Sequence, residues 1–438
     1  MKFDTTKPLN KQPTCQHSTI TTPRDPPYPP FLKGGDNTRL RLGQPPMHIF
    51  FSVGEPSGDL HAAKLVAELK RRMPELECSG FGGPLMKDAG CRVLFRLTDL
   101  AVMGILPVIP LIFKFISLSR RAQRYLARRR PDAVVLVDFP GFNWWIARAA
   151  KKLGIPVFYY LPPQLWAWAP WRVRRMKKSV DYVLSCLPFE VEWYRSRSVD
   201  AQFVGHPFFD EVAQKSLDTE FIRENSSAAT GAVRTVAVLP GSRNHEVQQN
   251  FPIQIRVMQK LHQRLPGVHF VVASYKDGQR DRCRRLLAER APELAVVLHV
   301  KKTSEIIELA DACLMVSGSV SLEVLARKTP AVVVYRIDRV FYWFSSTLIN
   351  CQYFSLPNLI ARHPVMPEFA PIDDPRWSID TMTDILHRWL TDEAAYSRQT
   401  GELGRLVAAV ATPGATANAA TAILDRLAPS SNAARRAA

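Results

Sequence analysis

Patterns that hold metal ions or redox cofactors are missing from this sequence. The seven cysteines are scattered, without a CxxC pair or a metal-ligand spacing, and several lie inside apolar runs, as Cys186 and Cys313 do. Asp-x-Asp, GxGxxG and Walker-type glycine loops do not occur. We therefore expect no metal and no cofactor, and a reducing cytoplasm as the compartment.

A clean hydrophobic run long enough to cross a bilayer is also lacking. The longest apolar stretch, residues 99–118, contains two prolines and Lys114 and falls short of the ~20 apolar residues that a spanning helix needs. Residues 1–46 contain nine prolines and no apolar core of a secretory signal. We expect this segment to be disordered, or to precede a true start at Met47, and we expect the chain not to cross the membrane.

Acidic residues are in deficit. The 40 Asp and Glu are outnumbered by 58 Lys and Arg, which gives a net charge of +18. A basic surface attracts phosphate on nucleic acid, on lipid or on small substrates, and charge alone does not choose among them. With 438 residues, of which 46% are hydrophobic, the chain is long and apolar enough for two globular domains.

Short apolar runs alternate with helical patterns from Met47 onward, which predicts α/β domains with parallel sheets. The first set of runs lies at 49–53, 133–137, 156–160 and 181–186, and the second at 235–239, 270–274, 295–300, 312–316 and 330–334. Between the sets, residues 214–232 are polar and typical of a linker. We therefore predict two consecutive doubly wound domains at 47–213 and 233–428, with a disordered tail at 429–438.

Candidate site residues in the first domain follow its predicted strands, where ligands bind in such sheets. The turn Gly54–Asp59 opens a helix directly after a strand, so a ligand can reach backbone N–H groups there; a tight turn capped by Ser57 or Asp59 is the alternative, and favoured on this motif alone. Asp138 follows the run 133–137 and has aromatic neighbours that would raise its pKa toward that of a general base. Helix capping by Asp138 is the equally weighted alternative.

The second domain offers an anion site in the same position. The segment Leu239–Arg243 lies at the end of a predicted strand. The charged guanidinium group of Arg243 can donate two hydrogen bonds to the oxygens of a pyrophosphate. Ser317, Gly318 and Ser319 form a small-residue turn at a helix start, where Glu323 could accept ribose hydroxyls. Of the ten histidines, only His206 is at a strand-end turn, where we expect a structural hydrogen bond.

An apolar stretch beside clustered arginines predicts contact with an anionic bilayer. Its proposed contact residues are Val108, Ile112, Phe115, Ile116, Arg120 and Arg121. A second basic group follows at 172–178, after three tryptophans. An ordinary helix with a solvated basic face is the alternative.

The motifs together resemble, in order, those of the lipid-A-disaccharide synthase family. The matching segments, which span about residues 47–370, are GEPSGD (54–59), FGGPLM (81–86), LAVMG (100–104), VDFPGFN (137–143), QLWAW (164–168), FVGHP (203–207), LPGSR (239–243), SGSVSLE (317–323) and SLPNL (355–359). The resemblance implies the GT-B fold, two Rossmann-like domains facing a cleft, and a metal-free inverting transfer. The donor would be UDP-2,3-diacylglucosamine, the acceptor 2,3-diacylglucosamine 1-phosphate and the products UDP and a β-1,6 disaccharide.

The same resemblance distributes roles over the motif residues. It places the essential aspartate at Asp138, and Glu55, which also falls on a family motif position, is the second residue expected to be catalytic. The UDP-sugar set is Gly241, Ser242, Arg243, Ser317, Gly318, Ser319, Glu323, Asn358 and Glu368, and the acceptor side receives Ser57, Asp59 and Asn143. The family usually has a second acidic residue where Gly141 stands, so Asp138 is the only carboxylate of its motif here.

The substrates imply a peripheral enzyme on the cytoplasmic face of the inner membrane, in contact with anionic lipid and not with nucleic acid. A homodimer is compatible with these features. The alternatives are another GT-B enzyme that uses a UDP-sugar, such as a peptidoglycan-type N-acetylglucosaminyltransferase or a UDP-sugar epimerase, and a non-catalytic membrane- or nucleic-acid-binding protein. That last reading leaves LPGSR and SGSVSLE unexplained.

Overall fold

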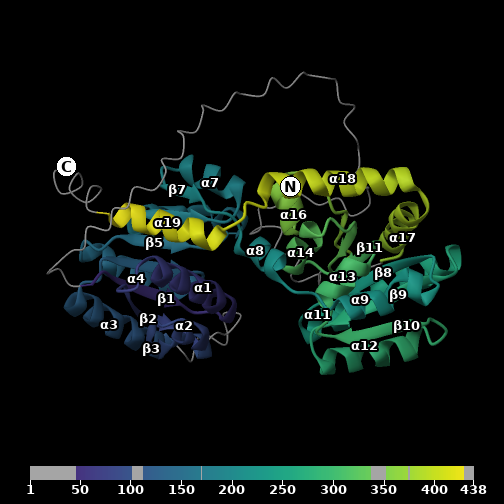
Figure 1. Cartoon of the computed structure of the whole chain (residues 1–438), viewed down its shortest axis with the longest axis horizontal. Helices are drawn as coiled ribbons and strands as arrows, with labels where there is room; N and C mark the ends of the chain where they lie inside the picture. Colours follow the sequence, from purple (N-terminus) through teal and green to yellow (C-terminus); the bar gives the residue numbers. More distant parts are fainter. Residues whose placement is uncertain (1–45, 101–111, 169, 337–351, 373–374, 429–438) are drawn as a thin grey trace, which may run out of the picture. The chain divides into compact units, whose positions relative to one another are not determined.

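The computed structural model describes residues 46–100, 112–168, 170–336, 352–372 and 375–428. Within these residues, two parallel β-sheets are flanked by helices (Figure 1). Every apolar run predicted to be a strand is one, because β-branched and aromatic residues with few charges suit strands that are covered on both faces. The Rossmann-like α/β class expected from the alternating pattern is confirmed.

The first sheet has the strand order β3-β2-β1-β4-β5-β6-β7, and all neighbouring strands are parallel. Its strands are β1 (His48–Val53), β2 (Glu77–Gly82), β3 (Arg92–Arg96), β4 (Ala133–Val137), β5 (Val157–Tyr160), β6 (Tyr182–Ser185) and β7 (Ala201–Phe203). Sequence patterns did not indicate β2, β3 or β7, since ECSGFG lacks a β-branched run and the other two alternate with charge or are very short.

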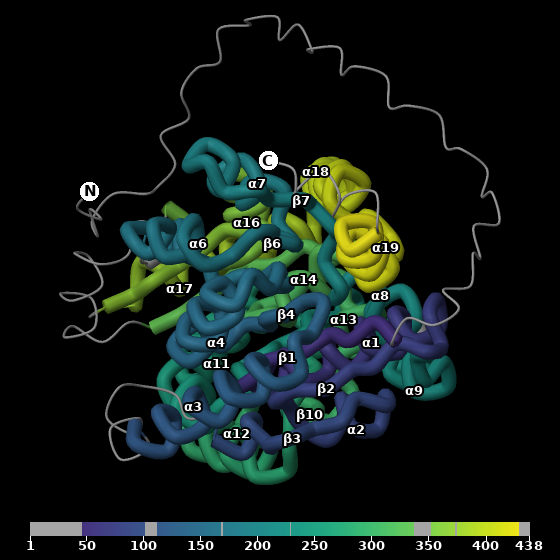
Figure 2. Tube along the Cα trace, turned by 90° about the vertical axis from the view of Figure 1, so that its left-hand side faces the viewer, coloured from purple at the N-terminus to yellow at the C-terminus, as the bar shows by residue number. Residues whose placement is uncertain are grey.

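Helices cover both faces of this sheet. The helical elements of the first half are α1 (Pro56–Arg72), α2 (Pro84–Asp88), η1 (Leu97–Leu100), α3 (Ile112–Arg129), α4 (Pro140–Lys152), α5 (Leu165–Trp168), η3 (Pro170–Arg172), α6 (Val173–Ser179) and α7 (Pro188–Arg195). Ile49 and Phe51 of β1 pack with α1 on one face, while Phe50 packs with α3 and α4 on the other, as the period of two in a strand requires. Figure 2 shows α1 and α4 on opposite sides of β1.

The second sheet has the order β10-β9-β8-β11-β12-β13, again with parallel neighbours. Its strands are β8 (Arg234–Leu239), β9 (Val268–Ser274), β10 (Val296–Val300), β11 (Ala312–Met315), β12 (Ala331–Val334) and the two-residue β13 (Glu368–Phe369). The accompanying helices are α11 (Asn244–Arg264), α12 (Asp277–Arg290), α13 (Thr303–Leu309), α14 (Val320–Ala326), α16 (Leu356–Ala361), α17 (Arg376–Thr391) and α18 (Glu393–Val410).

The polar segment 214–232 is more ordered than a bare linker. It follows α8 (Pro207–Gln214) and contains the short helices α9 (Thr219–Asn225) and α10 (Ser227–Thr230). Phe221 is buried in the core of the second sheet, and Asp218 pairs with Lys302 at 2.6 Å. The buried ring of Phe221 and the ion pair of Asp218 thus help to attach this segment to the second sheet.

The last helix, α19 (Ala415–Leu427), packs on the first sheet, although the sequence pattern grouped it with the second half. Its small and apolar face, including Ala419 and Ile423, shares a core with Ile49 and Phe51. Among the described residues, Glu393–Leu427 is long and apolar enough to cross a bilayer by composition. It consists of two helices, however, separated at Gly414, whose φ is +77°, and the second contributes to a core.

Candidate active site

The first part of the site lies where β1 and β4 are neighbouring strands. The helices that follow them, α1 and α4, pack on opposite faces of the sheet. In doubly wound sheets, ligands bind outside the carboxyl ends of the strands at such a point. Val53 of β1 is paired with Val137 of β4, so Gly54 and Asp138 follow at the same level. The first strand-end motif and the candidate base are therefore neighbours in space.

The backbone of Asp138 is held in an unusual conformation. Asp138 and Phe139 both have φ of +47°, a left-handed conformation that is costly for residues with a side chain. The carbonyl oxygen of Asp138 accepts hydrogen bonds from the Tyr159 hydroxyl and from Asn143 Nδ2, both at 2.7 Å. The Phe139 ring lies against Gly54, where an added Cβ would come within 2.2 Å of ring carbons. A glycine is thus required at 54.

These contacts exclude the capping alternatives. The N-cap position of α4 is Phe139, with no side-chain capping bond. Asp138 Oδ1 accepts from the N–H of the adjacent Phe139 at 2.8 Å and not from the first turn of the helix. At α1 the N-cap is Glu55, also without a side-chain capping bond. The expected tight turn is present, but neither Ser57 nor Asp59 caps α1.

Two carboxyl groups lie together at these strand ends. Glu55 and Asp138 are hydrogen-bonded to each other through their side chains. Burial, the charge of Asp138 and this hydrogen bond raise the pKa of Glu55 to about 7, against a lowering by Arg243. Burial also raises the pKa of Asp138, and hydrogen bonds from Phe139 N–H and Glu55 partly offset the rise. This environment can supply a proton acceptor near neutral pH.

Two residues expected on the acceptor side have structural roles instead. Asn143 is fully buried and joins the two strand ends: it accepts from Ser52 Oγ at 2.6 Å and donates to the carbonyl of Asp138. Asp59 is 2% exposed and accepts from Gly83 N–H at 2.8 Å and Leu85 N–H at 3.0 Å, which caps α2. These structural contacts do not support a role in acceptor binding, which stays a prediction for both residues. Ser57 is exposed in the first turn of α1.

At the second sheet, β8 and β11 are neighbours, and the motif of Arg243 follows β8. Gly241 has φ of +118°, and an added Cβ would come within 2.7 Å of Glu246. The buried Glu246 carboxylate accepts from Ser242 N–H at 2.9 Å and pairs with Arg243 at 2.7 Å. The Arg243 side chain remains 52% exposed, and its charge acts on Glu55. Arg243 therefore lies near the carboxyl pair.

Glu246 is a site-supporting residue that the sequence interpretation missed. Its signal was available, because a Glu three residues after an N-cap position forms a capping box, as it does here. Tyr159 was missed as well, since a tyrosine inside an apolar strand gives no sign that its hydroxyl will orient a neighbouring aspartate.

The turn after β11 places Ser317, Gly318 and Ser319 before α14. Ser317 Oγ donates to the Phe354 carbonyl at 3.0 Å, and a Cβ at Gly318 would meet no atom within 4 Å, so this backbone is accessible. Glu323 is 8% exposed and Oε1 accepts from Arg327 at 3.1 Å. Its contact with a ribose stays a prediction.

Asn358 and Glu368, both expected to bind the UDP-sugar, support a loop. Asn358 is fully buried; it donates to the Met366 carbonyl and to Glu368 Oε1, each at 2.7 Å, and accepts from Met366 N–H at 2.8 Å. Glu368 also accepts from Ser355 N–H at 2.8 Å, at the start of α16. The burial of Asn358 does not support direct contact with a ligand, and UDP-sugar binding by Asn358 and Glu368 stays a prediction.

The predicted membrane residues fall on and before α3. Val108 lies outside the described residues. Ile112 is 37% and Phe113 80% exposed, whereas Phe115 is 5% exposed and packs against Phe139 and Phe142. Phe115 is therefore a core residue behind the Asp138 turn, which does not support its expected bilayer contact. Ile116 is partly buried, and Arg120 and Arg121 are exposed.

His206 has the structural role that the sequence predicted. Its Nδ1 accepts from Phe208 N–H at 3.2 Å at the start of α8, and burial lowers its pKa to about 4. A neutral imidazole in that position acts as a cap and not as a proton shuttle.

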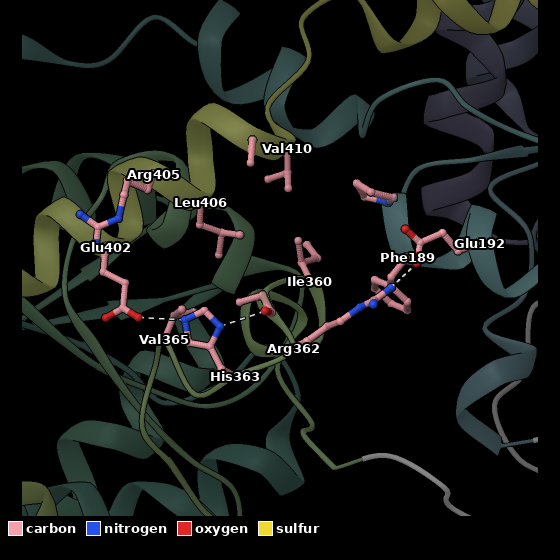
Figure 3. Close-up of a pocket in the computed structure, with 13 residues that line it drawn as sticks. Phe189, Glu192, Ile360, Arg362, His363, Val365, Glu402, Arg405, Leu406 and Val410 are labelled. Atoms are coloured by element: carbon pink, nitrogen blue, oxygen red, sulfur yellow. Dashed lines mark hydrogen bonds and ion pairs between the residues drawn. The ribbon is translucent and has the colours of Figure 1, made fainter. Parts of the chain in front are cut away.

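A hollow of about 470 Å³ lies between α7, α16 and α18 (Figure 3). Apolar side chains such as Phe189, Ile360 and Leu406 line it. On its rim, Arg362 pairs with Glu192 at 2.5 Å and His363 with Glu402 at 2.9 Å. None of the predicted site residues lines it. Among the described residues, no cluster of three or more His, Cys, Asp or Glu could hold a metal ion.

Two doubly wound parallel sheets with site motifs at their carboxyl ends define the GT-B class of sugar-nucleotide enzymes. The UDP-GlcNAc 2-epimerase of Neisseria meningitidis, solved with UDP-GlcNAc, matches with a TM-score of 0.55 at 12% identity, over 87% of this chain and 99% of that one. The calicheamicin glycosyltransferase CalG4 matches with a TM-score of 0.54 at 16% identity, over 88% and 100%. At such identities these matches establish the fold alone.

Within that class, the chain belongs to the Lipid-A-disaccharide synthetase family, whose model matches residues 49–376. The lipid-A-disaccharide synthase of Idiomarina loihiensis is 36% identical over 334 residues, which cover 76% of this chain and 87% of that protein. The synthase of Anaeromyxobacter dehalogenans is 34% identical over 376 residues, which cover 86% and 96%. The chain is a glycosyltransferase, as expected from its motifs.

Proposed function

We propose that this chain transfers 2,3-diacylglucosamine from UDP-2,3-diacylglucosamine to 2,3-diacylglucosamine 1-phosphate, forming the β-1,6-linked lipid A disaccharide 1-phosphate and UDP. The observation that carries the proposal is Asp138, a desolvated acid held by Tyr159 and Asn143 at the carboxyl end of β4. In a chain of this family, a base at that point is suited to activate a sugar hydroxyl.

Asp138 takes the proton of the acceptor 6-hydroxyl. The hydroxyl oxygen bonds to the anomeric carbon of the donor while the bond from that carbon to the diphosphate breaks, so the configuration inverts and UDP leaves with the electron pair. Arg243, half exposed and near Glu55, is suited to neutralise the charge of the departing diphosphate. The open turn at Gly318 is the second place where phosphate can approach backbone N–H groups.

The same substrates favour a peripheral enzyme on the cytoplasmic face of the inner membrane. Each acyl CH₂ left in water costs ~0.8 kcal/mol, so donor and acceptor are best drawn directly from a lipid surface. Ile112 and Phe113 are exposed apolar residues at the start of α3, and Arg120 and Arg121 are exposed on the same helix. We assign this end of α3 to contact with anionic lipid.

UDP release with synthetic UDP-2,3-diacylglucosamine and 2,3-diacylglucosamine 1-phosphate tests the activity. Release is expected only when both are present, with the disaccharide detected by mass spectrometry. UDP-N-acetylglucosamine as donor, and the Asp138→Asn variant, serve as controls. Turnover of the unacylated donor but not of the acylated one would assign the site to another UDP-sugar reaction.

Liposome sedimentation tests the membrane contact. The double variant Ile112→Ser/Phe113→Ser is expected to bind less to anionic liposomes while remaining folded by circular dichroism. Phe115→Ser is the matched comparison, because loss of this buried ring should lower the free energy of unfolding by ~3 kcal/mol or more. A folded double variant that still sediments fully would exclude these two residues as the contact.

A further inference from the structure

The segment that follows β5 contains the QLWAW motif (164–168). Tyr160 of β5 is paired with Val137 of β4, so Leu161 and Asp138 follow at the same level. Leu161 has φ of +53°, a left-handed conformation like that of Asp138, and such strain is common around active sites. The segment therefore leaves the sheet directly beside the candidate base, where the acceptor of the proposed reaction must lie.

Helix α7 holds this segment at two points. Glu190 and Tyr194 are one turn apart on α7 and so lie on the same face of the helix. The Tyr194 hydroxyl donates to the Pro163 carbonyl at 3.1 Å, and Glu190 Oε1 accepts from Trp166 Nε1 at 3.0 Å. The Phe189 ring packs edge-on against the Trp166 ring, with 4.9 Å between the centroids. A hydrogen bond and a ring contact thus orient the Trp166 indole.

Glu190 is a buried acid with no part in the proton transfer proposed for Asp138. It is 2% exposed, and its Oε2 is hydrogen-bonded to Ser185 Oγ at 2.5 Å. Burial raises the pKa of Glu190 to about 8, against a lowering by the hydrogen bonds of Ser185 and Trp166, so the acid keeps its proton near neutral pH. The protonated acid can donate to Ser185 Oγ, whose own hydrogen then turns to the Leu187 carbonyl at 3.2 Å. The bond to Trp166 is therefore available without a buried charge.

We infer that Trp166 contacts the acylated sugar acceptor, and that Glu190 is a positioning residue that orients the indole for this contact. The inference rests on the proposed function, since it concerns the acceptor of that reaction. Trp166 is partly exposed, and because its N–H is already bonded, what it offers a ligand is apolar ring surface. Apolar surface beside Asp138 fits the C–H groups of an acylated sugar, whereas a diphosphate would be met by Arg243.

Steady-state kinetics with each substrate varied in turn test the inference. Glu190→Leu leaves the indole N–H without its acceptor, so the KM for 2,3-diacylglucosamine 1-phosphate should rise by about 10-fold, while kcat and the donor KM change little. Glu190→Gln should keep the wild-type acceptor KM, because its carboxamide oxygen can accept from Trp166 and its nitrogen can donate to Ser185 Oγ. Equal rises in acceptor KM for the two variants would overturn the role of this hydrogen bond.

A double-mutant cycle shows whether Glu190 acts through Trp166. Trp166→Phe keeps an apolar ring but removes the N–H, so it should raise the acceptor KM to a similar extent. Glu190→Leu combined with Trp166→Phe should be no worse than either single variant, because no unpaired group is left, and penalties that add would overturn the positioning role. Glu192→Gln is the matched control: Glu192 is exposed on the same helix and pairs with Arg362 (Figure 3), and its loss should leave all constants unchanged.

A second measurement needs no activity. In proton–nitrogen NMR of the free protein, the Trp166 indole N–H is assigned by its absence in Trp166→Phe. It should exchange slowly with water in wild type and in Glu190→Gln, and about 10-fold faster in Glu190→Leu. Equally slow exchange in Glu190→Leu, shown to be folded by circular dichroism, would mean that other contacts hold the indole and would overturn the role of Glu190. If Glu190→Leu does not fold, a wild-type acceptor KM in Trp166→Phe still overturns the inference.

The outcomes separate this inference from the proposed function. If Asp138→Asn retains kcat, the proposed function fails and the assignment of Trp166 to the acceptor fails with it. If Asp138→Asn is inactive, while folded Glu190→Leu and Trp166→Phe keep the wild-type acceptor KM, the inference is overturned and the proposed function stands.

Discussion

The carboxyl ends of β1 and β4 in the first sheet, and of β8 and β11 in the second, occupy equivalent places in their strand orders, but their side chains differ in kind. The first pair presents Glu55 and Asp138, two acids whose pKa values are raised by burial. The second presents Arg243, half exposed and paired with Glu246, followed by a turn open at Gly318. One topology thus supports two different environments.

The difference follows from what each environment does to charge. Desolvation disfavours the ionised carboxylates and makes them better proton acceptors, which is the property a base needs. An arginine that keeps access to water stays charged and ready to meet a diphosphate. We therefore assign the chemistry to the first sheet and the holding of the donor to the second, and substitutions on the two sides should affect different parameters.

The largest effect is expected for Asp138→Asn. An amide cannot accept the hydroxyl proton, so kcat should fall by ~10²-fold or more while UDP affinity stays nearly unchanged. Asp132→Asn, at the other end of β4, is the matched control: Asp132 Oδ2 accepts from His48 N–H at 2.8 Å, a bond that an asparagine can keep. A near-normal kcat for purified Asp138→Asn would refute the division of roles.

Arg243→Ala should act on binding as well as on rate. Loss of a charged hydrogen bond of ~1.5–3 kcal/mol corresponds to a fall in UDP affinity of roughly 10- to 100-fold, which calorimetry measures. Arg243→Lys is the control, because it keeps the charge near Glu55 and loses the two-pronged geometry. Unchanged UDP affinity in the alanine variant would place the diphosphate elsewhere. Donor binding could then no longer be assigned to Arg243 and the second sheet.

Sequence patterns predicted the parts of this molecule that depend on local composition. Strands such as β4 and β11 are uninterrupted apolar runs, and Asp138 and Arg243 stand immediately after such runs. The strands β2 and β13 escaped detection because they are glycine-containing or two residues long, and they depend on pairing with neighbours already in place.

The roles of buried polar residues were not predictable in the same way. Asn143, Asp59 and Asn358 each belong to a motif and carry groups that can bind a ligand, but each satisfies backbone groups brought close only by the fold. Membership of a motif does not distinguish a residue that touches substrate from one that holds the loop around it. Nor does a contact between Glu55 and Asp138 follow from two motifs 83 positions apart until the register of β1 and β4 is known.

The smallest effect is expected for a substitution at Gly141, in the first turn of α4. This turn differs from the first turn of α11 in lacking an acidic residue. The first turn of α11 contains Glu246, whereas the first turn of α4 contains no acid. Gly141 is exposed in that turn, and a Cβ there would meet no atom within 4 Å, so Gly141→Asp introduces no clash. A carboxylate near a helix N-terminus stabilises by ~0.3–1 kcal/mol at low ionic strength, and the gain should shrink as salt is added. Thermal unfolding of Gly141→Asp and of Gly141→Asn, which has the same size without the charge, measures this difference.

The added negative charge should also raise the pKa of the neighbouring carboxyl pair slightly, moving the acid limb of kcat to higher pH. Equal stability and equal pH profiles for the two variants would show that the first turn of α4 does not act electrostatically on Asp138.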